Sequence, residues 1–293
     1  HQTIIDRNLL HPFSPAMSIT AIRATKKLLA TGPDNISYKH LKHIGPHADR
    51  ALTDIYNQSV SHNTIPNSWK TAKILPILKQ NKPFTEPASY RPIALLPNPS
   101  KILERLFLNK INPDIPLDNS QHGFHPKHST TTLLTNLTQQ IHEGMNDKKP
   151  AKRSLLAALD VQKAFDTVSR RILINKILDT DIHPNYKKLL SNFLSGRQAH
   201  TVYNSKISQT RQFTNGVPQG SVYRQHFLTH NLPAPTQPST HIRSNADNLT
   251  IITQHPNYET ATKDMQQYIH TVETWLQHNR MSVSAEKSSM TLI

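Results

Sequence analysis

The chain has 293 residues, which suits one large domain or about two smaller ones, and it contains no cysteine. Disulfide scaffolds, thiolate zinc sites and cysteine nucleophiles are therefore excluded. Lysine and arginine number 34 against 19 aspartates and glutamates, and the net charge of +15 points to a polyanionic partner, either nucleic acid or an anionic membrane surface.

Eighteen histidines and only seven glycines make the composition unusual. The histidines could bind metal, but a coding strand rich in A and C would raise His, Pro, Thr, Asn, Gln and Lys together and deplete Gly, and we favour this explanation. No apolar run approaches the roughly 18 residues of a membrane span. Because there is no secretory signal and the first residue is His1, we expect an intracellular fragment of a longer protein, in the nucleus or the cytoplasm.

The first half of the chain predicts helices around a pair of short strands. Apolar residues recur at helical spacing, and Ser129 offers an N-cap hydroxyl to the helix that follows it. Prolines interrupt the two extended runs and favour strands at a sheet edge. The predicted helices cover residues 14–30, 46–62, 99–110 and 129–143, and the predicted strands cover residues 73–78 and 90–95.

The second half contains an apolar run that ends in a carboxylate. The run 155–159 predicts a strand buried on both faces, with Asp160 at its carboxyl end, where sheet proteins commonly place chemistry. Asp247 is flanked by short β-like runs and is predicted to lie at the tip of a hairpin. The other predicted elements are helices over 169–179, 184–194 and 257–279, a hairpin over 198–213 that turns at 204–206, an irregular segment over 231–241 and a short β-like tail.

Asp160 and Asp247 suit a site for hard cations. Carboxylates at strand ends offer the oxygen ligands that Mg²⁺ prefers, and two such ions can hold the attacking and leaving oxygens of a phosphoryl displacement. Taken singly, each carboxylate is better explained without a metal, Asp160 as a helix cap and Asp247 as a turn residue. The order of the surrounding motifs decides between these interpretations.

Six motifs in chain order resemble those of reverse transcriptases from non-LTR (jockey-like) retrotransposons. Any one of them is weak, whereas six in register are specific. The segment 159–166 resembles the first catalytic motif, 216–221 the motif that contacts nucleotide and template, and Ala246-Asp247 the aromatic-Ala-Asp-Asp motif. Two further matches resemble the fingers motifs: 89–93 with 101–104, and 123–124 with 129–130. The segment 32–34 resembles the amino-terminal motif, and Lys287 the lysine-bearing motif that follows the third one.

The resemblance implies a role for each matching catalytic residue. Asp160 and Asp247 would bind two Mg²⁺ ions, with Mn²⁺ as an alternative, and Lys287 would donate a proton to the leaving pyrophosphate. Phe165 would pack beneath the nucleotide sugar and exclude a 2′-hydroxyl, although on its own it suits a core position equally well.

The resemblance also implies a set of nucleotide-binding residues. Gln219 and Gly220 would approach the incoming nucleotide, where the missing Cβ of a glycine lets the backbone come close. Arg91 and Lys73 would hold triphosphate oxygens, although a solvated surface explains either cation as well.

Three departures from the family pattern fall on functional positions. The third motif reads Asn245-Ala246-Asp247-Asn248, so Asn248 lacks a carboxylate and Asn245 lacks an aromatic ring. The stretch after Ser221 looks a few residues short, and His125 stands where an arginine is usual. Loss of selection on a mobile element and retention as a nucleic-acid-binding remnant both explain these changes.

The resemblance implies an α+β fold of the polymerase right-hand type, with fingers, a palm whose antiparallel sheet packs on helices, and no thumb. We expect an amino-terminal helical extension over residues 1–68, a fingers region over 69–150 and a palm over 151–293. The expected function is RNA-directed DNA polymerization by two-metal phosphoryl transfer to a primer 3′ end. The partners would be an RNA template, a DNA primer and deoxynucleoside triphosphates, with no membrane and an undetermined oligomeric state.

Two alternatives remain open. The chain could be an inactive remnant that only binds nucleic acid, because Asn248 and Asn245 weaken the third motif. It could also lack a stable fold, because the short stretch after Ser221 and the missing thumb leave core surface exposed.

Overall fold

A computed structural model of the chain describes residues 12–25, 30–111, 120–123, 128–147, 149–162, 169–213, 215–216, 232–246 and 248–293. The chain forms two compact units. The first unit combines residues 1–116 with 170–224, and the second combines 117–169 with 225–293. This grouping differs from the three consecutive ranges expected from the sequence, because the elements after residue 169 return to pack with the first 116 residues.

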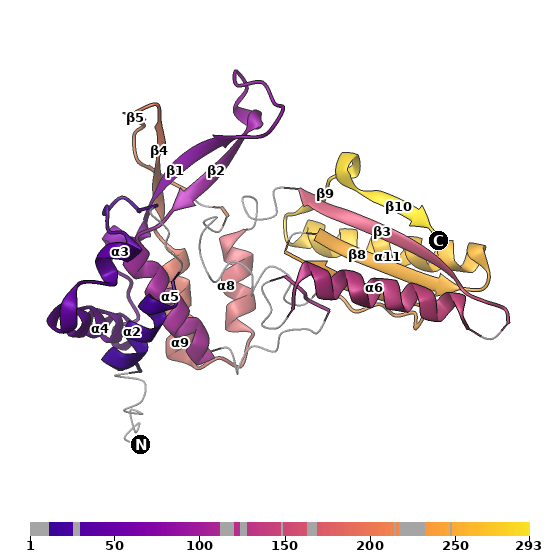
Figure 1. The fold of residues 1–293 in the computed structure, drawn as a ribbon, viewed down its shortest axis with the longest axis horizontal. Coiled ribbons are helices and arrows are strands. Elements are labelled where there is room, and N and C mark those ends of the chain that lie inside the picture. The colour runs from indigo at the N-terminus through magenta and orange to yellow at the C-terminus, as the bar shows by residue number, and fades with distance from the viewer. Residues whose placement is uncertain are drawn as a thin grey trace. The chain divides into compact units, whose positions relative to one another are not determined.

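The first unit is built mainly from helices around an aromatic core (Figure 1). Tyr56 and Phe107 are completely buried, and the ring of Phe107 meets that of Tyr186 edge-on at 5.0 Å between centroids. Its helices are α2 (Pro15–Arg23), α3 (Tyr38–Leu41), α4 (Gly45–Ser61), η1 (Asn67–Lys70), η2 (Pro87–Ser89), α5 (Asn98–Ile111), α8 (Arg170–Leu178) and α9 (Pro184–Leu194).

The sheet of the first unit has the strand order β2-β1-β4-β5, with β6 paired to β4. The prediction of an edge strand is wrong for β1, which lies between β2 and β4. The parallel ladder to β4 covers only residues 71–74, so Pro76 lies beyond it and removes no hydrogen bond to β4. On the other side, Pro76 pairs with Pro92 of β2, so the two prolines, neither of which has a backbone N–H, interrupt the antiparallel ladder at the same position. The strands are β1 (Thr71–Leu78), β2 (Tyr90–Leu95), β4 (Gln198–Tyr203), β5 (Lys206–Ile207) and β6 (Arg211–Gln212).

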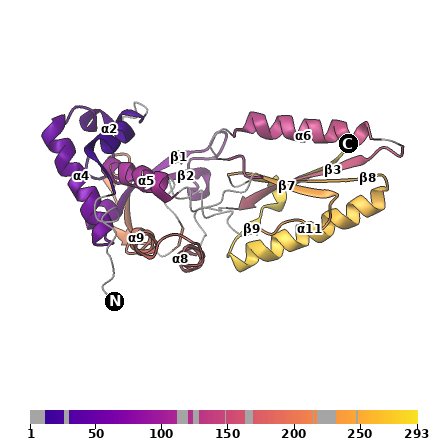
Figure 2. The ribbon, with the colours of Figure 1, turned by 90° about the horizontal axis from the view of Figure 1, so that it is seen from below.

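The second unit is an antiparallel sheet with a helix on each face, and Figure 2 shows α6 and α11 on opposite sides of it. Leu156 and Ile252 pack on α6 together with Leu133 and Leu137. The predicted α+β class is thus confirmed. The elements are α6 (Thr130–Met145), β3 (Arg153–Gln162), β7 (Thr240–Asn245), β8 (Asn248–His255), α11 (Tyr258–His278), β9 (Ser282–Val283), η4 (Ala285–Lys287) and β10 (Ser289–Leu292), in the order β10-β3-β8-β7.

Local signals account for where the two helices of this unit begin. The Ser129 hydroxyl accepts a hydrogen bond from Thr132 N–H, and Thr132 Oγ1 accepts one from Ser129 N–H, which is a complete capping box. The Asn257 side chain caps α11 by accepting from Thr260 N–H. The predicted helices over 129–143 and 257–279 are confirmed.

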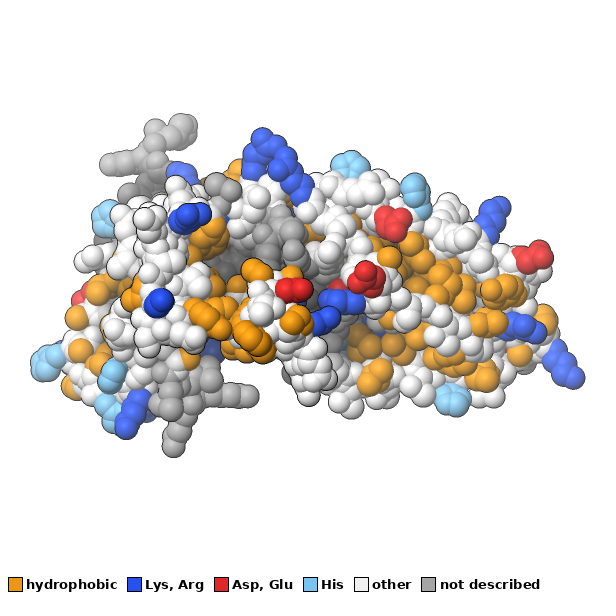
Figure 3. Space-filling model, turned by 90° about the horizontal axis from the view of Figure 1, so that it is seen from above, with side chains coloured by type: hydrophobic (Ala, Val, Ile, Leu, Met, Phe, Trp, Pro, Cys, Tyr) orange, Lys and Arg blue, Asp and Glu red, His pale blue; other side chains and the backbone are white. Residues whose placement is uncertain are grey.

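The outer strand β10 leaves an apolar sheet edge exposed. Figure 3 views the side on which β10 lies in Figure 1, and hydrophobic side chains gather there over the second unit. Met290 and Leu292 of β10 are about half exposed, at 52% and 47%. No helix in the described part of the chain is long and apolar enough to cross a bilayer.

Candidate active site

Asp160 and Asn248 lie directly opposite each other on neighbouring strands of the second unit. The register of β3 and β8 pairs Asp160 with Asn248, and residues paired in this way have Cβ atoms about 4.5–5.5 Å apart. Side chains alternate along β3, so Asp160 shares the α6 face with Leu156. Its side chain is 30% exposed, which leaves the carboxylate open to a ligand from solvent.

The hairpin predicted around Asp247 is confirmed. Asn245 pairs with Asn248, which leaves a two-residue turn between β7 and β8. The first turn residue, Ala246, has a φ of 60°, a left-handed conformation that tight hairpins favour. Asp247 itself lies outside the described residues, so its place among metal ligands stays a prediction.

Gly123 lies against this hairpin turn. A Cβ atom on Gly123 would lie 2.3 Å from Ala246 N and 2.9 Å from the Asn245 Oδ1. The segment runs beside β7, where His122 N–H donates to Ser244 O at 2.7 Å and Ser244 N–H donates to Ser120 O at 2.9 Å. A glycine from a motif that the sequence assigned to the fingers therefore fits the backbone of the Asp247 hairpin.

Lys287 lies beside Asp160. Its Nζ is 3.8 Å from the Asp160 Oδ1, and its side chain is 71% exposed. The short helix η4 is held there by hydrogen bonds, because Ser284 N–H donates to Asp160 O at 2.8 Å and Asp160 N–H donates to Ser288 Oγ at 3.2 Å. The structure thus brings together two residues that the sequence predicted as catalytic.

Lys73 and Arg91 share one face of the sheet in the first unit. Lys73 pairs with Leu95, and Arg91 pairs with Ile77, four positions along β1, so the alternation of side chains sets both cations on the same side. Four strand residues span about 13 Å, a separation that two long side chains can close. This placement is compatible with one anionic ligand between them.

Asp34 of the amino-terminal motif lies within range of the positive charges of Lys73 and Lys101. Burial raises the pKa of the Asp34 carboxyl above its usual value, against the hydrogen bond from Ile36 N–H and the positive charges of Lys73 and Lys101. Gly32 of the same motif lies against the backbone of Leu96 and Pro97, where a Cβ would lie 2.5 Å from Pro97 N. The motif therefore contributes a carboxylate to the surroundings of a predicted triphosphate ligand.

Arg170 anchors the start of the segment 216–221. It is 8% exposed, its Nε donates to Gly216 O at 3.0 Å, and its guanidinium lies 4.4 Å from the centroid of the Phe213 ring. Burial lowers its pKa to about 10. Three predicted site residues in the adjoining segments, Phe165, Gln219 and Gly220, lie outside the described residues.

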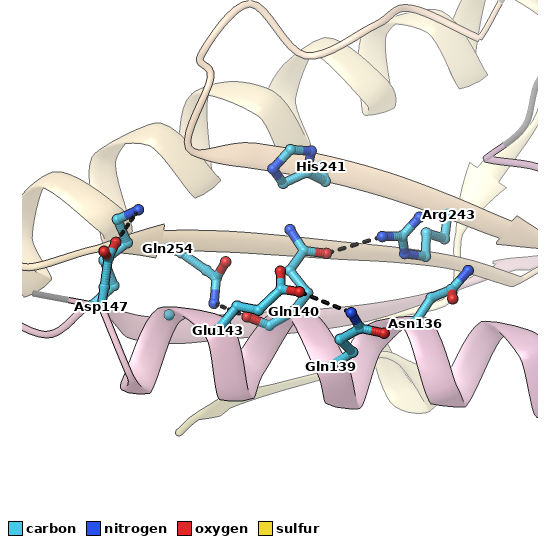
Figure 4. Close-up of a pocket in the computed structure, with 10 residues that line it drawn as sticks. Asn136, Gln139, Gln140, Glu143, Asp147, His241, Arg243 and Gln254 are labelled. Carbon is cyan, nitrogen blue, oxygen red and sulfur yellow. Dashed lines mark hydrogen bonds and ion pairs between the residues drawn. The ribbon is translucent and has the colours of Figure 1, made fainter.

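A separate groove of about 570 Å³ runs between α6 and the strands β7 and β8. Figure 4 shows Arg243 donating to Gln140, at 3.1 Å, and Gln139 donating to Glu143, at 2.9 Å. Burial, with Arg243 nearby, lowers the pKa of His241. The lining holds no predicted site residue, and it consists of Asn136, Gln139, Gln140, Glu143, Gly144, Asp147, Lys152, His241, Arg243 and Gln254.

The predicted metal site depends on a residue that is not described. Within the described ranges, no group of three or more histidine, aspartate or glutamate side chains could hold a metal ion. Asp160 contributes one carboxylate, and Asn248 contributes an amide oxygen opposite it. The second carboxylate of the prediction is Asp247.

Comparison with known proteins identifies the family. The model of the reverse transcriptase (RNA-dependent DNA polymerase) family matches residues 77–292, which include Asp160, Asn248 and Lys287. The chain belongs to the reverse transcriptase family. The membership predicted from the six motifs is thereby confirmed.

Similar proteins of known type come from mobile elements of Drosophila melanogaster. A probable RNA-directed DNA polymerase from transposon BS is 30% identical over 92% of this chain and 31% of its own length. The RNA-directed DNA polymerase from mobile element jockey is 27% identical over 97% of this chain and 33% of its own length. A probable RNA-directed DNA polymerase from transposon X-element is 31% identical over 95% of this chain and 31% of its own length. This reverse transcriptase chain thus spans about a third of the length of the relatives it matches.

The sequence did not indicate what two residues contribute to the candidate site. Arg170 follows the first motif but looks like one of two helix-surface arginines in the run Arg170-Arg171. Gly123 belongs to a predicted fingers motif, but its contact with the hairpin that ends at Asn245 and Ala246 depends on strand pairing that the sequence does not show. The scarcity of glycine in the chain is the one sequence signal that marks Gly123 as constrained.

Proposed function

We propose that this chain is the RNA-directed DNA polymerase domain of a non-LTR retrotransposon, which adds deoxynucleotides to a primer 3′ end. The fingers would cover residues 69–150 and the palm residues 151–293, after the helical extension over residues 1–68. The observation that carries the proposal is the pairing of Asp160 with Asn248 beside the hairpin tip, with Lys287 Nζ 3.8 Å from Asp160. Three motifs far apart in the sequence contribute to this arrangement.

Asp160 and Asp247 would hold Mg²⁺ or Mn²⁺. The side chains known to meet at this end of the sheet, Asp160 and Asn248, present oxygen donors, which both ions accept. When bound, such ions supply positive charge that stabilises the oxygens exchanged at phosphorus. Asn248 offers an oxygen without a negative charge, so it would weaken ion binding compared with an aspartate at this position.

The other residues would bind and orient the substrates. Lys73 and Arg91 would hold triphosphate oxygens, Gln219 and Gly220 would approach the nucleotide, and Phe165 would exclude a 2′-hydroxyl. The primer 3′-hydroxyl loses its proton to water as its oxygen bonds to the α-phosphorus, and the bond from that phosphorus to the pyrophosphate oxygen breaks. Lys287 would give the leaving pyrophosphate a proton.

Positive charge would hold the template and primer. The chain has 34 lysines and arginines against 19 acidic residues, and phosphate contacts bind nucleic acid largely without regard to sequence. The affinity for an RNA–DNA template–primer should therefore fall steeply as salt concentration rises. A shallow salt dependence would contradict this role of the charge.

Extension of a DNA primer on an RNA template, with Mg²⁺ or Mn²⁺, tests the proposed function. The expected product is a primer lengthened only when the deoxynucleotide complementary to the template is present. Asn248 and Asn245 favour a second candidate, a non-catalytic nucleic-acid-binding protein on the same fold. Tight, salt-sensitive template–primer binding without extension, even after Asn248 is restored to aspartate, would establish that second candidate.

Arg170→Met is expected to raise the KM for the deoxynucleotide about tenfold, with a smaller change in kcat, because the loop that leads to Gln219 loses its anchor at Gly216. The free energy of unfolding should change by no more than about 1 kcal/mol, since the substitution also removes a desolvated charge. Single-nucleotide kinetics and urea unfolding, in the Asn248→Asp background, measure these effects. Arg171→Met is the matched control on the exposed side of α8, and equal KM values for the two variants would contradict the anchoring role.

A further inference from the structure

A second groove, of about 380 Å³, lies on the first unit between the end of α4, the helix η1 and α9. We refer to it as the Lys70 groove. Its lining includes polar side chains from all three elements and from the loop between α4 and η1. The lining residues are Ile55, Gln58, Ser59, His62, Thr64, Ile65, Pro66, Asn67, Lys70 and Asn192.

Lys70 is a groove-lining cation without a counter-ion among the described residues. The residue as a whole is only 8% exposed, but its Nζ is not among the fully buried polar atoms, so the ammonium opens into the groove. It has no hydrogen bond or ion pair with a described residue, so water or an anion in the groove is the partner open to it. A lysine in this position is therefore poised to accept an anion from outside the chain.

A second cation, the buried Arg197, lies close enough to act on Lys70. Arg197 is completely buried, and its guanidinium donates to Phe193 O at 2.9 Å and to Trp69 O at 3.5 Å, while its Nε has no partner. Burial lowers the pKa of Lys70, and the charge of Arg197 lowers it further. Glu104 acts on Arg197 in the opposite sense, because it raises the pKa of Arg197 and offsets part of its charge, so Lys70 is the cation that remains open to an anion in the groove.

The lining of the Lys70 groove complements an anion. None of its ten side chains is acidic, whereas the groove between α6 and the second sheet includes Glu143 and Asp147. Asn192 Oδ1 accepts from Ile65 N–H at 2.9 Å, which leaves the Asn192 amide N–H₂ as a donor without a partner in the described chain. An ammonium and a nearby amide are the donors that a tetrahedral oxyanion requires.

We propose that the Lys70 groove binds a phosphate group, with the Lys70 ammonium as its principal ligand. A volume of about 380 Å³ exceeds that of a free phosphate, so the groove also accepts the group that carries the phosphate. The source is either a small phosphate compound or the backbone of a nucleic acid, and the chemistry of recognition is the same. This site is separate from the polymerase residues and does not depend on the proposed function.

Inorganic phosphate and a single-stranded RNA are the probes that test the site, with Lys70→Met and Lys188→Met as matched variants of the full chain. Both substitutions remove one positive charge, but Lys188 is exposed on α9 outside the groove. At constant ionic strength, phosphate at about ten times its Kd should raise the Tm of the unaltered chain and of Lys188→Met by about 3 °C. The same addition should leave the Tm of Lys70→Met unchanged.

RNA binding separates the two sources of phosphate. If the phosphate belongs to a nucleic acid, Lys70→Met should weaken RNA binding and lower the salt slope by about one, while Lys188→Met should not. A Tm shift by inorganic phosphate alone identifies a small phosphate compound. The proposal is overturned if Lys70→Met and Lys188→Met behave alike with both probes, or if neither probe binds.

Discussion

Asn248→Asp is expected to raise the rate of primer extension with Mg²⁺ about 100-fold. The register places residue 248 directly opposite Asp160, so the change sets a further carboxylate beside that of Asp160. A bound catalytic ion contributes several kcal/mol of transition-state stabilisation, and a carboxylate that holds the ion more firmly recovers part of it; about 2.7 kcal/mol corresponds to 100-fold. Single-turnover extension at saturating deoxynucleotide measures the effect.

The same substitution should make stability depend on the metal. Without divalent ions, two facing carboxylates repel each other, and the free energy of unfolding should fall by up to about 1 kcal/mol. Addition of Mg²⁺ should restore it, because ions that bind the folded chain stabilise it by mass action. The unaltered chain, in which Asp160 faces an uncharged amide, should respond less.

Asn245→Asp is the control for charge alone. Asn245 pairs with Asn248 across the hairpin but lies on β7, which is not adjacent to β3. The substitution adds the same negative charge one strand farther from Asp160, so it should give little of the gain in extension rate. An equal gain from both variants would show that net charge, rather than position opposite Asp160, limits the rate.

Gly123→Ala is expected to lower the free energy of unfolding by about 1–3 kcal/mol, the usual cost of forcing an extra methyl group into packed surroundings. The new Cβ would lie 2.3 Å from Ala246 N, a backbone atom that cannot move without the turn. A shift of about 1 Å at a reacting group can cost 100-fold in rate, so primer extension in the Asn248→Asp background should fall by about that factor. Urea unfolding and single-nucleotide extension measure the two effects.

Gly144→Ala is the matched control in the same unit. Its new Cβ would lie 2.4 Å from the Gln254 Nε2, the end of a side chain that can move away at the expense of its hydrogen bonds to Gln140 O and Ser154 Oγ. It should cost less stability and leave extension unchanged, since the Asp247 hairpin is not involved. If Gly123→Ala extended primers as fast as Gly144→Ala, the contact with the turn would have no bearing on the site.

Much of the fold could be predicted because its signals are local. Ser129 marks the start of α6 through a capping box that requires only neighbouring residues. The turn at Asn204 and Ser205, both with positive φ, follows from residue types that tolerate this conformation. The hairpin around residue 247 was predictable for the same reason.

The grouping of elements into two units could not be predicted locally. The strand β3 and the helix α8 are neighbours in the sequence, yet β3 belongs to the second unit and α8 to the first. Which surfaces pack together depends on long-range contacts that leave little trace in local spacing. The interior position of β1 escaped prediction similarly, because Pro76 is harmless once the ladder to β4 ends at residue 74.

Buried cations also escaped prediction. Lysine and arginine are rarely fully buried, so composition assigns them to the surface. Lys70, Arg170 and Arg197 are each less than 9% exposed. Lys70 lines a groove, whereas Arg170 and Arg197 donate hydrogen bonds to backbone carbonyl oxygens. The net charge of +15 therefore includes cations with specific structural surroundings as well as a solvated surface.

The most direct test of the central claim, that Asp160 serves metal-dependent phosphoryl transfer, is addition of one nucleotide to an RNA-templated DNA primer. The chain with Asn248→Asp should extend the primer in Mg²⁺, and the double variant Asp160→Asn with Asn248→Asp should not, although both bind the template–primer equally. Equal extension by both chains would contradict the role of Asp160. No extension by a folded, template-bound Asn248→Asp chain would contradict the polymerase function itself.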